Sequence, residues 1–302
     1  PYSKRFSGVT FFGNAACKNK KRKIMAKILQ RERLVPNIHL LEVHAPEIAQ
    51  KSKPGQFVIV MPHEKGERIP LTIADWDKEK GSVTSVFMVV GTSTHKLSLL
   101  EAEDEVPVFV GPLGKPSEIK KYGTVLLAGG CFGIAAIYPV ARALKEEGNK
   151  IITLLDVKAN YLLYWEEKLR AVSDQFLVSA RDSYYNCKDY IPKTLNNIIK
   201  KGSKIHKVIS IGCTYLMYTC SEATKPHGIE TSVSLNPIMV DGTGMCGACR
   251  VTVDGRTKFA CVDGPDFDGH LVDWQELFSR RKSYFEDEIQ SLCHWEKNNF
   301  PR

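Results

Sequence analysis

The segment Asp241-Gly-Thr-Gly-Met-Cys246-Gly-Ala-Cys249-Arg250 places two cysteines in a glycine-rich turn, and Cys261 follows after eleven further residues. Residues 251–260 alternate apolar positions around an Asp-Gly pair, which is typical of a β-hairpin. The hairpin is expected to bring Cys261 back beside the first two cysteines. Counted from Asp241, the spacing matches that of plant-type iron–sulfur ligands, with aspartate in place of the first cysteine. The stretch therefore predicts an iron–sulfur site whose ligands are Asp241, Cys246, Cys249 and Cys261.

Two other interpretations of this segment stay open. A zinc knuckle would use the same cysteines, although zinc sites usually pair two short ligand units and the Asp-Gly turn suits that spacing poorly. The cysteines could also be buried without a metal. Asp241 by itself is compatible with an ordinary Asp-Gly turn, in which case another residue would be the fourth ligand.

Length and composition bound the kind of protein. The 302 residues suffice for two domains or three small ones. No apolar run reaches the eighteen residues that a membrane helix needs, so we expect no membrane span. Nine cysteines without a secretory leader favour a reducing compartment and metal or redox use over disulfides. We therefore expect a cytoplasmic protein, with organellar import by residues 1–24 as an open alternative.

The positive charge is concentrated at one end of the chain. Residues 1–24 form a basic extension that holds seven lysines and arginines and no acid, out of a net charge of +8. The rest of the chain is nearly neutral, so a basic surface for nucleic acid is not expected.

Residues 25–118 show the pattern of a small antiparallel β-barrel. Short strand-like runs recur between Pro and Gly breaks, at 28–33, 38–43, 56–61, 82–90 and 105–110. Two stretches in this region could contact a phosphate: Arg68 to Thr72, with its basic residue, and Gly91 to Thr94, with small hydroxylated residues before a helix. The alternatives are a solvated charge at Arg68 and a simple N-cap at Thr92 to Thr94.

Residues 119–230 indicate an α/β domain. A buried strand at 124–128 leads into Gly129-Gly130-Cys131-Phe132-Gly133, a helix at 134–147 and a second strand at 150–157. A glycine turn in such a β-α-β unit is where a dinucleotide phosphate rests, although a plain strand–turn–helix junction has the same pattern. Further strands at 175–179 and 207–212 extend a mostly parallel sheet.

Residues 231–302 hold the cluster segment and one amphipathic helix at 274–291, with Leu277, Phe278, Phe285 and Ile289 on one side.

With barrel, nucleotide domain and terminal cluster in this order, the chain resembles the ferredoxin-NADP-reductase superfamily. Within it, residues 25–284 resemble the small subunit of the NADH-dependent reduced ferredoxin:NADP oxidoreductases. The most specific stretch runs from Ser234-Leu-Asn-Pro through the cysteine segment to Gly269-His-Leu-Val-Asp-Trp274. The related electron-transfer subunit of dihydroorotate dehydrogenase has cysteine at the Asp241 position, which makes that type the second choice.

The resemblance implies cofactors, ligands and a partner. It implies a [2Fe–2S] cluster held by one aspartate and three cysteines, and FAD in the barrel. It also implies a larger flavin and [4Fe–4S] subunit as partner, and electron bifurcation as the activity of the complex. The flavin motif falls on Arg68, Pro70, Leu71 and Thr72, and the pyrophosphate loop on Gly91, Thr92 and Ser93. Thr72 is expected near flavin N5 and is the candidate catalytic residue.

The nucleotide half departs from the family pattern. Cys131 and Phe132 interrupt the glycine turn that Gly129, Gly130 and Gly133 would form around NAD(H). Asp156 and Lys158 replace a Gly-x-Arg, and Ser183, Asn186 and Asp189 stand where glycines are usual. Asp156 is expected either to bind a ribose hydroxyl of NAD or to mark a lost nucleotide site. The chain is thus predicted to be an NADH-oxidising flavoprotein subunit, or alternatively a relay without a nucleotide site.

Overall fold

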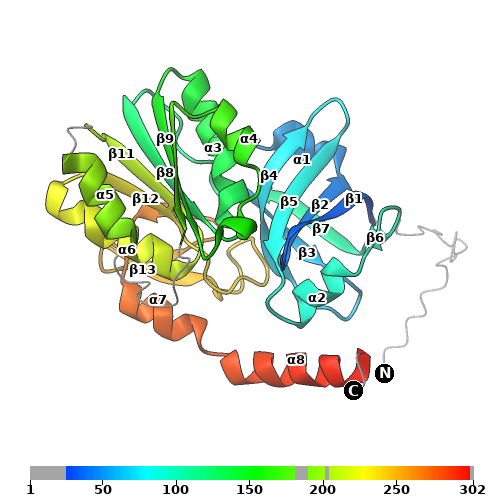
Figure 1. Cartoon of the computed structure of the whole chain (residues 1–302). Coiled ribbons are helices and arrows are strands. Elements are labelled where there is room, and N and C mark those ends of the chain that lie inside the picture. Colours follow the sequence, from blue (N-terminus) through cyan, green and yellow to red (C-terminus); the bar gives the residue numbers. More distant parts are fainter. Residues whose placement is uncertain (1–24, 181–189, 201–203, 300–302) are drawn as a thin grey trace, which may run out of the picture.

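The computed structural model describes residues 25–180, 190–200 and 204–299. The predictions for the basic extension 1–24 and for Ser183, Asn186 and Asp189 lie outside the described residues. The remaining chain forms a β-barrel, an α/β sheet domain and a C-terminal subdomain that contacts both, with the last two helices along one edge (Figure 1).

The N-terminal strands form a seven-stranded antiparallel sheet in the order β6-β1-β2-β5-β4-β3-β7. Its edge strands β6 and β7 are consecutive in the chain and separated by Pro107 alone, so the sheet curls until its two edges lie close together. Side chains such as Leu41, Ile73 and Phe87 fill the interior. The predicted small antiparallel barrel is confirmed. The strands are β1 Ala26–Val35, β2 Ile38–His44, β3 Phe57–Met61, β4 Ile69–Asp77, β5 Ser82–Met88, β6 Glu105–Val106 and β7 Val108–Leu113.

The second sheet has six strands in the order β10-β9-β8-β11-β12-β15. Its first five strands are parallel, whereas β15 comes from the C-terminal subdomain and pairs antiparallel with β12. The predicted α/β domain is therefore confirmed, and the subdomain is tied to it by backbone hydrogen bonds. The strands are β8 Thr124–Gly130, β9 Lys150–Val157, β10 Gln175–Ala180, β11 Lys207–Ile211, β12 Glu230–Ser234 and β15 Asp266–Asp268.

Helices cover both faces of this sheet. On one face, α3 (Gly133–Glu146) shares its core with barrel residues Ile38, Ala74 and Val86, so it lies between the sheet and the barrel (Figure 1). Arg142 of α3 also pairs with Asp75 of β4 at 3.0 Å. These contacts fix the barrel against the sheet. The other helices of these two domains are α1 Pro46–Lys51, α2 Thr92–Ser98, α4 Glu166–Ala171, α5 Tyr190–Lys200, α6 Thr214–Thr224 and the short 3₁₀ turns η1 Asn160–Leu162 and η2 Lys225–His227.

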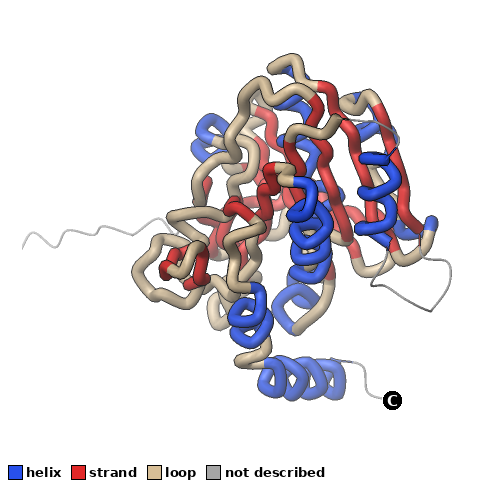
Figure 2. The backbone as a smooth tube through the Cα atoms, turned by 90° about the vertical axis from the view of Figure 1, so that its left-hand side faces the viewer, coloured by secondary structure: helices blue, strands red, loops and turns tan. Residues whose placement is uncertain are grey.

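The C-terminal subdomain consists mostly of loops around one hairpin (Figure 2). Strands β13 (Arg250–Val253) and β14 (Arg256–Phe259) pair across the Asp254-Gly255 turn, as predicted. Its core includes Phe57 from the barrel and Met217 from α6. The subdomain is thus packed on both larger domains rather than attached by a linker.

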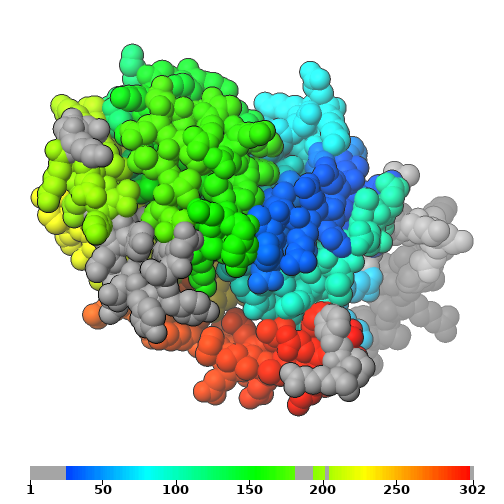
Figure 3. Space-filling model, viewed as in Figure 1, coloured from blue at the N-terminus to red at the C-terminus, as the bar shows by residue number. Residues whose placement is uncertain are grey.

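The prediction of one helix at 274–291 is wrong. The structure has two helices, α7 (Trp274–Arg281) and α8 (Phe285–Asn299), which are separated at Lys282. Leu277 is buried in the subdomain core, but Phe285 and Ile289 are exposed, because α8 turns away along the underside of the barrel (Figure 3). No helix within the described part of the chain is long and apolar enough to span a membrane.

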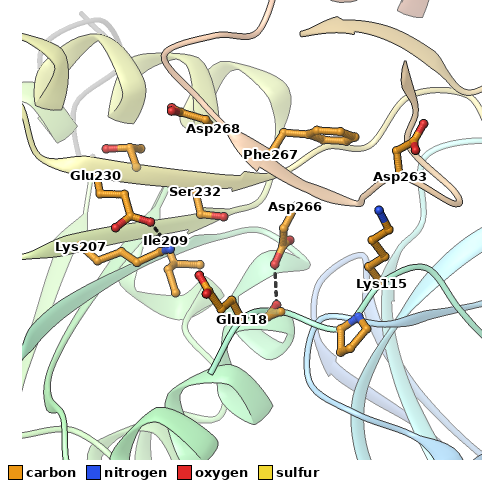
Figure 4. Close-up of a pocket in the computed structure, with 13 residues that line it drawn as sticks. Lys115, Glu118, Lys207, Ile209, Glu230, Ser232, Asp263, Asp266, Phe267 and Asp268 are labelled. Atoms are coloured by element: carbon orange, nitrogen blue, oxygen red, sulfur yellow. Dashed lines mark hydrogen bonds and ion pairs between the residues drawn. The ribbon is translucent and has the colours of Figure 1, made fainter. Parts of the chain in front are cut away.

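A cavity of about 260 Å³ lies where the barrel-to-sheet connection meets β12 and β15 (Figure 4). Lys207 and Glu230, which begin β11 and β12, pair there at 2.6 Å. The cavity is therefore at the amino ends of the parallel strands, opposite to the end that binds dinucleotides. Ser117 Oγ donates to Asp266 Oδ2 at 2.5 Å, and the Lys115 N–H donates to the Gly264 carbonyl at 2.7 Å. These contacts join the connection to β15.

We predict that Asp266→Asn stabilises the protein at pH 7.5 but not near pH 4. Burial raises the pKa of Asp266 above its ordinary value, despite the Ser117 hydrogen bond. A raised carboxyl pKa in the folded state gives stability that is present at low pH and is lost as the pH rises through that pKa. Urea unfolding at both pH values measures the difference. Asp268→Asn, at the exposed neighbour, is the control, and an equal or lower midpoint for Asp266→Asn at pH 7.5 would contradict the prediction.

Candidate functional site

The hairpin brings two of the predicted ligands together. The sulfurs of Cys249 and Cys261 are 3.1 Å apart, and both residues are buried. The Ala260 N–H donates to the Cys249 carbonyl at 3.1 Å, which holds the end of β14 beside the start of β13. Cys246 lies in the same loop but is exposed. The loop thus offers an inner pair of thiols and one outer thiol.

Burial and the neighbouring Cys249 thiol raise the pKa of Cys261 to about 12. Two adjacent buried thiols do not ionise readily, because each negative charge would lack solvent and would repel the other. A bound metal centre supplies the positive charge that makes both thiolates stable. The chemistry of this pair therefore fits a metal centre.

Asp241 occupies the entry to the loop. Its Oδ2 accepts hydrogen bonds from the Thr243 hydroxyl, from the Thr243 N–H at 3.0 Å and from the Met245 N–H at 3.3 Å. The Thr243 hydroxyl is the main reason that the pKa of Asp241 is lowered, and Arg68 contributes. Asp241 is thus an ionised carboxylate that caps its own loop. Among the described residues, no three His, Cys, Asp or Glu side chains surround one point as ligands of a single ion.

The cluster loop is seated directly on the barrel. Gly242 has a positive φ of 81°, and a Cβ there would lie 2.8 Å from Leu113 and 2.9 Å from Ile59. Leu113 belongs to β7 and Ile59 to β3, so glycine lets the loop backbone approach the barrel wall. Asp241 is therefore placed close to the predicted flavin stretch, as the influence of Arg68 on its pKa also indicates.

The two predicted flavin stretches converge. Ser93 Oγ donates to Glu67 Oε2 at 2.9 Å, which joins the start of α2 to the segment that leads into β4. Thr72 lies on β4 opposite Phe57 and is half-buried, with Pro70 and Leu71 preceding it on the same strand. Arg68 is exposed beside them. The alternative of an N-cap at Thr92 to Thr94 is wrong, because Gly91 is the N-cap of α2; Thr94, at the third helical position, accepts the Gly91 N–H through Oγ1 at 3.0 Å.

The glycine turn at the carboxyl end of β8 is tightly packed. A Cβ at Gly133 would lie 2.0 Å from the Ile211 carbonyl oxygen, and one at Gly130 would lie 2.9 Å from Leu216. Gly129 is equally confined by Ile137 at 2.8 Å. Gly133 thus lets the turn after β8 pack against the end of β11, while Gly129 and Gly130 leave room for Ile137 of α3 and Leu216 of α6.

Two residues at this edge bear on nucleotide binding. Asp156 is only 6% exposed, so its carboxylate is covered rather than open to a ribose hydroxyl. Cys131 has a positive φ of 52°, and its carbonyl accepts the Tyr164 hydroxyl at 2.7 Å. The turn therefore keeps the tight backbone of a phosphate loop even though cysteine replaces glycine.

Three contacts at the site had no signal in the sequence. Arg281 of α7 donates to the Thr214 hydroxyl at the start of α6. On α8, Trp295 packs on His95 of α2 with ring centroids 5.0 Å apart, and Ser291 is 2.9 Å from the Thr92 hydroxyl. Each contact joins residues far apart in the chain, so no local spacing could indicate them. The C-terminal helices thus reach both the nucleotide edge and the predicted pyrophosphate loop.

The cysteine segment matches a known domain. Residues 236–273 fit the iron-sulfur cluster binding domain of dihydroorotate dehydrogenase B. The chain is 45% identical over 262 residues to a Thermotoga maritima protein called dihydroorotate dehydrogenase B (NAD(+)), electron transfer subunit homolog, with 87% of this chain and 92% of that protein covered.

Solved structures with the same overall fold are similar to this chain. One from a study of flavin-based electron bifurcation by an NADH-dependent reduced ferredoxin-NADP oxidoreductase is 44% identical, with a TM-score of 0.83, and covers 90% of this chain and 98% of that one. Phthalate dioxygenase reductase, at 16% identity and a TM-score of 0.54, covers 78% of this chain and 87% of its own, and shows the fold alone. The ferredoxin-NADP-reductase-like fold predicted from the sequence is confirmed.

We predict that Gly242→Ala displaces the cluster loop. Alanine at this position is strained in the left-handed backbone conformation, and its Cβ clashes with Ile59 and Leu113. Together the two effects should lower the free energy of unfolding by about 2–4 kcal/mol. Gly255→Ala is the matched control, because Gly255 also has a positive φ, of 65°, but nothing lies within 4 Å of the added carbon. Thermal unfolding and iron content of the purified variants measure both effects. Equal losses in the two variants would show that the barrel contact is unimportant.

Proposed function

Because this chain belongs to the family of dihydroorotate dehydrogenase B electron transfer subunits and their homologues, we propose that it carries electrons between NADH, FAD, a [2Fe–2S] cluster and a partner subunit. When bound, FAD exchanges two electrons with a nicotinamide and passes them on singly, and the cluster carries one electron at a time. The observation that carries the proposal is the seating of the cluster loop on the barrel wall at Gly242, beside the flavin stretch.

The ligand set proposed for the cluster is Asp241, Cys246, Cys249 and Cys261. A two-iron cluster takes its ligands in pairs, two on each iron. The buried pair Cys249 and Cys261 suits one iron, and the outer residues Asp241 and Cys246 suit the other. Asp241 and Cys246 would hold the cluster on its solvent side, where a partner could approach. Glycines at 242, 244 and 247, all with positive φ, shape the loop around the site.

FAD is proposed to lie along the barrel between the two converging stretches. Thr72, half-buried on β4, would hydrogen-bond near the reactive edge of the flavin ring. Arg68 would neutralise phosphate charge, with Gly91, Thr92 and Ser93 on the other side of the pyrophosphate. The Ser93 hydroxyl now donates to Glu67 and would turn to a phosphate oxygen instead.

NAD(H) is proposed to bind at the carboxyl ends of β8 and β11, over Gly129, Gly130 and Gly133. The packing of these turns supports the site, because it keeps the backbone close enough for a phosphate to approach. The covered Asp156 favours the second candidate, a relay subunit without nucleotide binding. The partner we propose is a larger flavin and [4Fe–4S] subunit, or a dihydroorotate dehydrogenase in the alternative.

The test is an anaerobic visible spectrum of the cofactor-loaded protein before and after NADH is added. Flavin and cluster bands that bleach with NADH would support the NADH-oxidising subunit. Bands that bleach only with dithionite would contradict it and support the relay. A colourless protein after reconstitution with FAD, iron and sulfide would contradict both.

We predict that Asp241→Cys shifts the electron paramagnetic resonance signal of the reduced protein, because a thiolate donates more charge to iron than a carboxylate does. Asp254→Asn, in the hairpin turn of the same subdomain, should leave the signal unchanged. Continuous-wave spectra of the two dithionite-reduced variants and the native protein measure the effect. An unchanged signal in Asp241→Cys would show that another group is the fourth ligand.

A further inference from the structure

We infer that Arg281, on helix α7 of the C-terminal subdomain, binds the pyrophosphate of the pyridine dinucleotide. The inference rests on the nucleotide site proposed above. It adds to that site the cation that would hold the negatively charged phosphates. This cation belongs to the subdomain that carries the cysteine loop, and not to the nucleotide domain.

Among its described residues, the nucleotide domain provides little positive charge at the carboxyl ends of β8 and β9. The segment after β9, where an arginine would be expected, has Asp156 and Lys158. Asp156 is buried and has the same sign as a phosphate, and Lys158 is an exposed side chain. The glycine turn after β8 offers backbone N–H groups but no charge. A cation from another part of the chain would therefore add to the phosphate contacts that these described residues can make.

Arg281 stands at the required place. Its Nη1 donates to the hydroxyl of Thr214, which begins α6 directly after β11. The turns after β11 and β8 touch, since a Cβ at Gly133 would lie 2.0 Å from the Ile211 carbonyl oxygen and one at Gly212 would lie 2.9 Å from that of Gly130. Arg281 is thus next to the turn that contacts the predicted phosphate loop.

The guanidinium has capacity for an anion. Its hydrogen bond goes to the neutral hydroxyl of Thr214. Glu288 on α8 acts to raise the pKa of Arg281, but the two side chains form no ion pair among the described residues. Burial lowers the pKa of Arg281, whereas Arg142, also partly buried, pairs with Asp75 at 3.0 Å. A partly desolvated cation without a carboxylate partner is stabilised by an anionic ligand. The residue is also exposed enough for a ligand to reach it.

The Thr214 contact orients the side chain and leaves most of its donors available. Thr214 Oγ1 donates to Asn236 Oδ1 at 3.1 Å, and Asn236 Nδ2 donates to the Gly212 carbonyl at 3.2 Å. Arginine has five N–H donors, and this network uses one of them. The preceding residue, Arg280, donates to the Ala248 carbonyl in the cysteine loop at 3.3 Å. The last turn of α7 therefore contacts the nucleotide edge and the cluster loop at once.

The experiment compares Arg281→Gln, Arg281→Lys and Lys282→Gln in the cofactor-loaded protein. Lys282→Gln removes the same charge one residue further along, at an exposed position. Isothermal titration with NAD⁺ gives the Kd, and the anaerobic rate of flavin bleaching by dihydronicotinamide riboside, which lacks phosphate, gives a second measurement. We expect Arg281→Gln to raise the Kd for NAD⁺ about 10-fold or more, as for a lost hydrogen bond to a charged group. Arg281→Lys should recover part of the affinity, and Lys282→Gln should behave as the native protein.

The phosphate-free substrate separates a phosphate contact from a structural role. Arg281→Gln should leave bleaching by dihydronicotinamide riboside unchanged. If both ligands are affected equally, or if the NAD⁺ affinity of Arg281→Gln and Arg281→Lys equals that of the native protein, the inference is overturned while the proposed function stands. If the native protein itself does not bind NAD⁺, the nucleotide part of the proposed function fails and this inference fails with it. Circular dichroism and the visible spectrum verify that each variant is folded and loaded.

Discussion

The close contact between Gly242 and the barrel wall is the constraint on which the arrangement of the sites depends. Electron transfer between two centres requires that they be held at a short and fixed separation. Here the loop that carries the proposed cluster ligands packs the backbone of Gly242 against Ile59 and Leu113. A larger residue would require the loop or these two side chains to shift. The missing Cβ at Gly242 thus lets the cysteine loop lie directly on the barrel.

A similar close backbone contact occurs between the turns at the carboxyl ends of β8 and β11, where the nucleotide is proposed to bind. Gly133 lies against the Ile211 carbonyl so closely that even alanine would not fit. The turn after β8 therefore packs directly on the backbone at the end of β11. Thr214, Asn236 and Arg281 extend this contact to α7 through side-chain hydrogen bonds. These polar contacts add to the apolar packing of Phe57 and Met217 and to the pairing of β15 with β12, which join the C-terminal subdomain to both larger domains.

The cysteine loop has a buried apolar side and a polar side. The buried pair Cys249 and Cys261 lies in an apolar core together with Val251, Leu277 and Phe57, where thiolates are stable only beside a cation. Asp241, in contrast, is held ionised at the mouth of the loop by its own backbone and by Thr243. One loop thus combines a low-dielectric inner side with a polar outer side. Such an asymmetry would place the two sides of a bound metal centre in different surroundings.

The sequence by itself determined the local elements and the kind of chemistry. Hydrophobic periodicity was sufficient for the barrel strands and the parallel sheet, and the cysteine spacing with its Asp-Gly hairpin was sufficient for the metal loop, because each of these depends on neighbours in the chain. Tertiary structure decided what depends on distant residues. The break between α7 and α8, the burial of Asp156 and the contact of Arg281 with Thr214 arise from packing between segments far apart, and periodicity within one segment carries no information about them.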